Sequence, residues 1–252
     1  MENTGFYITL PSNASLDIFP KNEISDYSVK LAKPVNLQGP WEAGLMEIQY
    51  PHTWDTLDKR DSWYTIRRGE PAELINVGFP HGFYPTIQAL LDTINKSIAS
   101  LERYADIHLF LNNSRRKVFV RSPDLTVEFI CSGKLSMVLG NVQHIKNNTK
   151  NTDKTRADID GGFYSLMIYS DIVEYQRVGD SYAPLMRTAQ VKGENNGIVN
   201  IQYMKPDYIP VSKCHFDTIN IQIRDDQGDL VSFKYGKVLV KLHLRPRRER
   251  DN

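Results

Sequence analysis

The amino-acid sequence predicts a mainly β protein: a β-sandwich built from both ends of the chain, with a small α+β insertion in the middle. Apolar and polar residues alternate with period two near both termini, as in strands that bury one face. In the middle, apolar residues recur at spacings of three and four, as on the buried face of a helix. The length of 252 residues is sufficient for both parts.

Half-buried strands are predicted wherever this alternation is clear. Near the N-terminus the apolar positions are Phe6, Ile8 and Leu10, and then Tyr27, Val29 and Leu31. Near the C-terminus they are Ile219, Ile221 and Ile223, and then Val238, Val240, Leu242 and Leu244. Shorter strands are predicted at Phe163–Ile168, Leu185–Gln190 and Ile198–Tyr203. Strands from opposite ends of the chain are therefore expected to pair.

The central region has a different pattern. An amphipathic helix is predicted with Pro85 at its first position and with the apolar residues Ile87, Leu90, Leu91, Ile94, Ile98 and Leu101. A hairpin follows over 107–120, then a strand at Leu125–Ile130, and a short helix between a Ser132 cap and a Gly140 stop. These elements predict a small α+β unit.

The predicted boundaries follow from these patterns. Residues 1–79 and 163–246 are assigned to the discontinuous sandwich, and residues 80–143 to the insertion. The polar segment 144–162 has no periodicity and is predicted to be a flexible loop, and 247–252 is a basic tail.

Composition excludes several classes of protein. The formal net charge of +1 does not favour a protein that coats nucleic acid with positive charge. Cys131 and Cys214 are too few for a disulfide framework, which predicts a reducing compartment. The sequence has no signal peptide and no apolar run that could span a membrane. A chain that is made in the cytoplasm, and neither secreted nor bound to a membrane, is predicted.

The sequence contains no recognisable catalytic or metal motif. Its histidines form no HExxH pair, its cysteines form no CxxC, and no nucleophile elbow or phosphate-binding loop is present. Asp158–Gly162 resembles the start of a calcium loop but lacks the closing glutamate. Asp225 and Asp226 precede Gly228 in a predicted turn, which accounts for both carboxylates. We therefore predict a non-enzymatic protein with no cofactor and no metal.

The densest aromatic stretch is WEAGLMEIQYPHTW, residues 41–54. Rings at strand ends often complete the core of a sandwich, and this is the favoured interpretation. The second is a subunit interface formed by Trp41, Tyr50, His52 and Trp54, since Trp and Tyr are common anchors of interfaces.

Arginines are concentrated at the C-terminus, at Arg245, Arg247, Arg248 and Arg250. Such a run can contact the phosphates of a polyanion or act as a nuclear import signal. Glu249 and Asp251 dilute its charge, so a solvated end of the chain is favoured.

Several segments together resemble one family. They are FYITLPSNASLDIFPKN (6–22), WEAGLMEIQYPHTW (41–54), GFYPTIQALLDTIN (82–95), LSMVLGN (135–141) and FDTINIQIRDDQGDLVSFKYGKVLVKLHLR (216–245). In this order and spacing they are similar to minor capsid proteins of Polinton/Maverick elements and related adintovirus-like elements. The resemblance extends from about Phe6 to Arg245, and the loop 144–160 and the last residues are not matched.

The resemblance implies a single jelly-roll penton subunit of a virion. Five copies would form a homopentamer at an icosahedral vertex, among double-jelly-roll major capsid proteins. The chain would be made in the host cytoplasm, with assembly there or in the nucleus, and packaged DNA would be the partner of any polyanion contact. The family has no catalytic residues to transfer.

Two alternatives stay open. A jelly-roll module that binds carbohydrate or protein could use Trp41, Trp54 and Trp63 as a platform. A cupin-like enzyme needs a metal-binding histidine cluster, for which His52, His81 and His108 are too scattered in the sequence.

Overall fold

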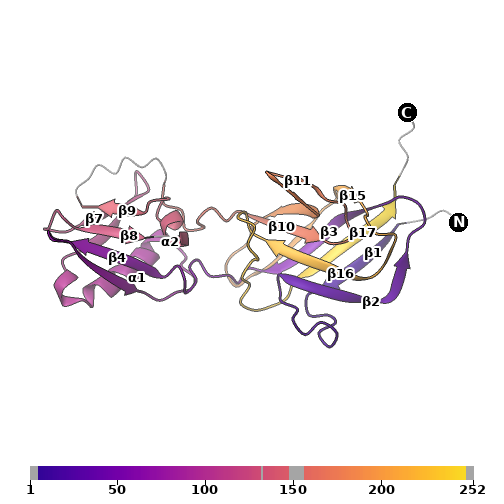
Figure 1. The fold of residues 1–252 in the computed structure, drawn as a ribbon, viewed down its shortest axis with the longest axis horizontal. Coiled ribbons are helices and arrows are strands. Elements are labelled where there is room, and N and C mark those ends of the chain that lie inside the picture. Colours follow the sequence, from indigo (N-terminus) through magenta and orange to yellow (C-terminus); the bar gives the residue numbers. More distant parts are fainter. Residues whose placement is uncertain (1–4, 132, 148–155, 248–252) are drawn as a thin grey trace. The chain divides into compact units, whose positions relative to one another are not determined.

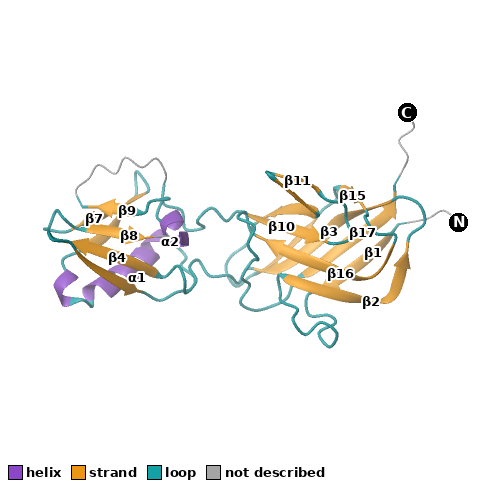
Figure 2. Ribbon diagram, viewed as in Figure 1, coloured by secondary structure: helices purple, strands orange, loops and turns teal. Residues whose placement is uncertain are grey.

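The structure of this chain is a computed structural model that describes residues 5–131, 133–147 and 156–247. The chain forms two compact units (Figure 1). Unit 1 consists of Met1–Trp54 and Phe163–Asn252, and unit 2 consists of Asp55–Gly162. Among the described residues the helices are confined to unit 2, as Figure 2 shows. The mainly β prediction is thus confirmed.

Unit 1 contains two antiparallel sheets. The first has the order β1 (Phe6–Pro11), β17 (Leu239–Pro246), β3 (Trp41–Pro51) and β14 (Ile198–Gln202), with β15 (Tyr208–Pro210) also paired to β3. The second has the order β13 (Leu185–Gln190), β10 (Ser165–Ser170), β16 (His215–Arg224) and β2 (Asp26–Asn36). A separate hairpin joins β11 (Gln176–Val178) to β12 (Ser181–Ala183).

The order of the strands defines a jelly roll. β1 pairs with β17, with Leu10 opposite Val240, so the first and last strands of the chain are neighbours. Four of the crossings between the sheets run from β1 to β2, from β3 to β10, from β13 to β14 and from β16 to β17. Because neighbouring strands are antiparallel, these four connections lie at one end of the sandwich. Such repeated crossing of paired strands is the jelly-roll arrangement.

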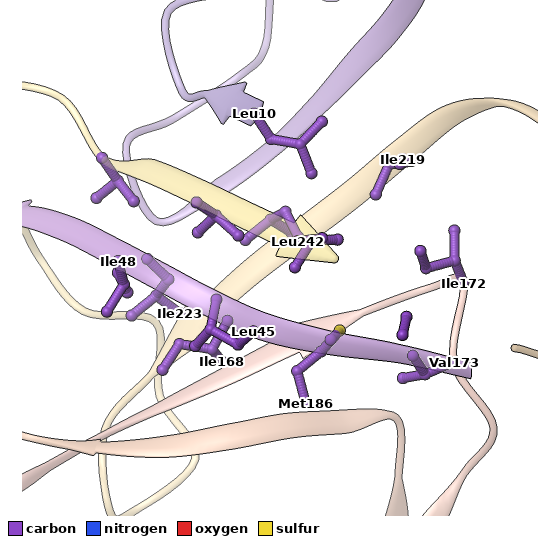
Figure 3. Close-up of a cluster of buried hydrophobic side chains, with 14 of the residues drawn as sticks. Leu10, Leu45, Ile48, Ile168, Ile172, Val173, Met186, Ile219, Ile223 and Leu242 are labelled. Atoms are coloured by element: carbon purple, nitrogen blue, oxygen red, sulfur yellow. The ribbon is translucent and has the colours of Figure 1, made fainter. Parts of the chain in front are cut away.

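The core of unit 1 lies between its two sheets. Figure 3 shows Leu10, Ile48 and Leu242 of the first sheet near Ile219 and Ile223 of the second. These side chains are fully buried. Burial of each contributes about 1.5–3 kcal/mol relative to exposure in water. No described residue of 55–162 belongs to this buried cluster.

Unit 2 is an α+β unit with its own core. Its main sheet has the order β5 (Glu73–Gly78), β4 (Trp63–Arg68), β8 (Glu128–Cys131) and β9 (His144–Lys146). A hairpin joins β6 (His108–Asn112) to β7 (Lys117–Arg121). The helices are α1 (Ile87–Ala99), the 3-10 turn η1 (Glu102–Tyr104) and α2 (Gly133–Val138).

Helix α1 supplies one side of this core. Its predicted apolar face is confirmed, since Leu90, Leu91 and Ile94 are fully buried. The predicted start of the helix was wrong: Thr86 is the N-cap, and its side chain accepts a hydrogen bond from the Ala89 N–H. Pro85 lies before the cap, because a β-region residue with a free hydroxyl caps the helix better.

The predicted domain boundaries differ from the observed division. Residues 55–79 belong to unit 2, because β4 pairs with β8 of that unit, with Ile66 opposite Phe129. The segment 144–162, predicted to be a loop, begins with strand β9 and contains the buried residue Ala157, whose N–H donates to the Arg116 carbonyl. Residues 148–155 and Ser132 lie outside the described residues.

Candidate interaction surfaces

Two members of the predicted aromatic interface, Trp41 and Tyr50, lie in the core of unit 1. Their exposed fractions are 6% and 0%. The Trp41 indole donates to the Gln38 carbonyl at 3.0 Å, and the Tyr50 hydroxyl accepts from the Lys192 N–H at 3.0 Å. Burial raises the pKa of Tyr50. The prediction of a subunit interface at these two residues was therefore wrong, because β3 points both rings between the sheets.

His52 and Trp54 belong to an aromatic cluster at the end of β3. The Trp54 ring lies 4.1 Å from the ring of His52, 5.1 Å from Phe163 and 5.7 Å from Phe233, measured between centroids. Trp54 is the last residue of unit 1 before unit 2, and Phe163 is the first after it. The cluster therefore holds together the two points where the chain leaves and re-enters the sandwich. His52 and Trp54 are only partly buried, so part of their surface is still accessible.

The described C-terminal arginines have different environments. The Arg245 Nε donates to Glu42 Oε1 at 2.7 Å, and its guanidinium lies 3.5 Å from the centroid of the Tyr208 ring. Its positive charge is thus paired within unit 1, with the Glu42 carboxylate and the face of the Tyr208 ring. Arg247 is exposed and its backbone N–H donates to the Pro40 carbonyl. Arg248 and Arg250 lie outside the described residues.

An exposed aromatic pair lies on the β11–β12 hairpin, which stands off the sandwich in Figure 1. The exposed fractions of Tyr175 and Tyr182 are 56% and 67%, and their ring centroids are 5.7 Å apart. This hairpin was not predicted from the sequence. Gly179 has a φ of +60° at its turn, and Gly followed by Asp between two short strands is a signal that could have located it.

A second exposed patch of unit 1 lies at the end of the sandwich where the chain departs into unit 2. It contains Ile198, at the start of the edge strand β14, and Tyr235. The Tyr235 hydroxyl donates to Asn196 Oδ1, and its carbonyl accepts from the Thr53 hydroxyl at 2.9 Å. Hydrogen bonds therefore fix the position of the exposed Tyr235 ring.

The described residues include His, Cys, Asp and Glu side chains, which are types that can bind metals or take part in catalysis. Among them, no group of three or more His, Cys, Asp or Glu residues is placed to hold a metal ion. Cys131 is buried, which raises the pKa of its thiol to about 12 and disfavours the reactive thiolate. Over the same residues, no helix is long and apolar enough to cross a membrane.

Comparison with known proteins gives a likeness in structure and none in sequence. No protein-family model and no curated protein matches this sequence. The chain is similar to the crystal structure of the penton protein of mavirus, with a TM-score of 0.54 and 10% sequence identity. The match covers 96% of this chain and 99% of the mavirus chain, so the uncovered part is too short to contain either unit. The chain therefore has a penton-like fold, in which the jelly roll of unit 1 carries unit 2 between β3 and β10.

Proposed function

We propose that this chain is a minor capsid protein of penton type, five copies of which close an icosahedral vertex. The observation that carries the proposal is the likeness to a viral penton protein over both units, since a shared jelly roll alone would fit many functions. The similar segments described above support an origin in a Polinton/Maverick or adintovirus-like element. The neighbouring partner is a double-jelly-roll major capsid protein.

Two surfaces of unit 1 suit such a ring. Five-fold closure needs a heterologous interface, in which one surface of each copy meets a different surface of the next. The exposed tyrosines of the β11–β12 hairpin are one candidate, and the patch of Ile198 and Tyr235 is another. The accessible parts of His52 and Trp54 adjoin the second, because the His52 N–H donates to the Gly197 carbonyl.

Packaged DNA is a secondary partner in this proposal. Arg245 is already paired with Glu42, so contact with the phosphates depends on Arg247 and the residues after it. The protein acts in the virion, after synthesis in the host cytoplasm and assembly there or in the nucleus.

The mass of the assembled protein tests the proposal. Light scattering of the purified full chain, alone and with the major capsid protein of the same genome, should give a species of five times the 29.0 kDa monomer. Negative-stain images of that species should show five-membered rings. A closed dimer, or a chain that stays monomeric and does not bind the major capsid protein, contradicts the proposal.

The alternative of a binding module outside a virus has less support. Its platform of three tryptophans would need Trp41, which is buried, and Trp54, which packs in the aromatic cluster. Trp63 alone is largely exposed.

A further inference from the structure

One face of the main sheet of unit 2 is open to solvent. Alternation along the strands directs Tyr64, Ile66 and Phe129 into the core, where they are buried. The neighbouring positions of β4 and β5 therefore point the other way. Trp63 and Leu74 on this outer face have exposed fractions of 54% and 66%. A large ring on a central strand would ordinarily be covered, so its exposure calls for an explanation.

The Trp63 indole lies flat on the sheet because its partner in the register is a glycine. Trp63 is opposite Gly78 across β4 and β5. A Cβ at position 78 would lie 3.1 Å from both Cη2 and Cζ3 of the indole and 3.3 Å from Cε3. Nearly equal distances to three consecutive ring carbons place this point over the face of the ring, since a point at its edge would be nearer to one carbon. One ring face thus rests on Gly78.

A groove with a volume of about 340 Å³ adjoins the ring. It is lined by Trp63, Tyr64, Thr65, Asn76, Ile130 and Cys131, none of which carries a charge at neutral pH. The Thr65 hydroxyl donates to Asn76 Oδ1 at 2.6 Å, which fixes the orientation of that amide. Within the described part of the chain, the Asn76 Nδ2 and the Trp63 Nε1 have no hydrogen-bond partner. Two neutral donors are therefore available beside an aromatic ring.

We propose that this groove is a carbohydrate-binding subsite for a neutral sugar residue. A pyranose has a face of C–H groups that stacks on an aromatic ring and hydroxyls around its edge that accept and donate hydrogen bonds. Trp63 would provide the stacking surface, Asn76 a donor to a ring hydroxyl, and the lone pairs of the Thr65 hydroxyl an acceptor.

The chemistry of the groove separates this ligand from others. A phosphate or sialic acid needs a cation, and the lining has none. The volume is near the lower limit for a ligand pocket, which suits one or two sugar residues better than a long chain. The inference stands apart from the proposed capsid function, and on a particle such a site would attach it to a glycosylated cell surface.

The test begins with the full-length chain on an array of neutral oligosaccharides that end in glucose, galactose, mannose or N-acetylglucosamine. Sialylated and sulfated oligosaccharides form the acidic arm. Wild-type protein should bind neutral members, and the best of these is then titrated calorimetrically. Trp63→Ala should weaken binding at least 10-fold, and Asn76→Ala should weaken it several-fold.

Gly78→Ala is the most specific test of the indole's position, because it keeps every side chain that lines the groove. The added Cβ would force the indole away from the sheet, so affinity should fall several-fold. Leu74→Ala, on the same face but outside the groove, and Tyr182→Ala, on unit 1, are matched controls that should bind as wild type. Circular dichroism of each variant guards against misfolding.

Four outcomes would overturn the inference. The first is that no neutral glycan binds at millimolar concentration, and the second is that binding is confined to the acidic arm. The third is that Trp63→Ala binds with the same affinity as the wild type. The fourth is that Leu74→Ala loses as much glycan affinity as Trp63→Ala. The last would indicate a protein partner on the wider apolar face. None of them bears on the mass measurement that tests the capsid proposal.

Discussion

The rings of Trp54 and Phe163 meet edge to face with their centroids 5.1 Å apart, although all of unit 2 lies between them in the sequence. The contact joins the end of β3 to the segment that leads into β10. Edge-to-face pairs of this kind contribute about 0.5–1.5 kcal/mol beyond the area that they bury. Two residues of the sandwich itself thus hold together the two ends of the connection that contains unit 2.

Replacing Trp54 with alanine should destabilise unit 1. The variant loses ring contacts with His52, Phe163 and Phe233, and because Trp54 is only partly buried we expect a cost of about 2–3 kcal/mol, below the upper values for buried aromatics. Urea unfolding followed by circular dichroism measures the change. Tyr182→Ala, an exposed ring of the same unit, should change the free energy of unfolding by less than about 0.5 kcal/mol. Equal effects of the two variants would show that the cluster is not structural.

Unit 1 should fold without unit 2. In the part of the chain that the structure describes, its buried cluster contains no residue of 55–162. The proximity of Trp54 to Phe163 means that a few Gly and Ser residues can bridge the gap. The chain in which such a linker replaces 55–162 should give a β-type circular dichroism spectrum and a cooperative thermal transition. The separate segment 55–162 should also fold, because its buried residues lie within Leu57–Ala157. Aggregation or a disordered spectrum of the shortened unit 1 would refute its independence.

The exposed tyrosines of the β11–β12 hairpin should contribute to assembly and not to folding. Tyr175→Ala combined with Tyr182→Ala should lower the fraction of pentamer at a given concentration by at least 10-fold in sedimentation velocity. Thermal stability of the monomer should stay within error. The control is Leu16→Ala, which removes another exposed apolar side chain of unit 1. An unchanged distribution of species in the double variant would remove the hairpin from the interface.

A fall in pH should lower the folding stability of unit 1 through protonation of His243. Burial, and then the charge of Arg245, hold the pKa of His243 below its ordinary value of 6.5. The unfolded chain therefore takes up this proton more readily than the folded chain, and the stability present above pH 6.5 is lost as the pH falls below it. The ring also stacks on Tyr7 at 4.6 Å, and its Nδ1 lies 2.7 Å from the Tyr208 hydroxyl.

The difference between wild type and His243→Gln isolates this effect. Urea midpoints measured from pH 7.5 to pH 5.0 should fall more steeply for the wild type than for the variant. Parallel pH profiles would mean that His243 binds its proton equally in both states. Acidic residues contribute to both profiles alike, so they cancel in the comparison.

The longest elements could be predicted from sequence because their signal is local. Ile219, Ile221 and Ile223 alternate with polar residues and are fully buried in β16, and α1 has a single apolar face. The directions of side chains on β3 were harder to predict. Leu45 and Ile48 both point inward although they are three residues apart, because the register with β17 shifts between Lys241 and Leu242. Such a β-bulge changes which face a residue occupies, and composition does not reveal it.

The predicted boundary between the two units was wrong for a different reason. Tyr64 and Ile66 alternate with polar residues as clearly as any strand in unit 1. Alternation identifies a strand but not its partner, and β4 pairs with β8, which is far along the chain. The Trp63 groove could not be predicted from the sequence for the same reason, since it depends on the strand register that places Gly78 under the indole.

The separation of the two cores has a consequence for how such a protein changes over generations. Substitutions in unit 2 leave the buried contacts of the jelly roll intact, because the two buried clusters have no described residue in common. Selection can therefore act on each half at its own pace. The residues of the jelly roll are held to the geometry of its two sheets, while those between β3 and β10 are free to diverge or to be exchanged by recombination.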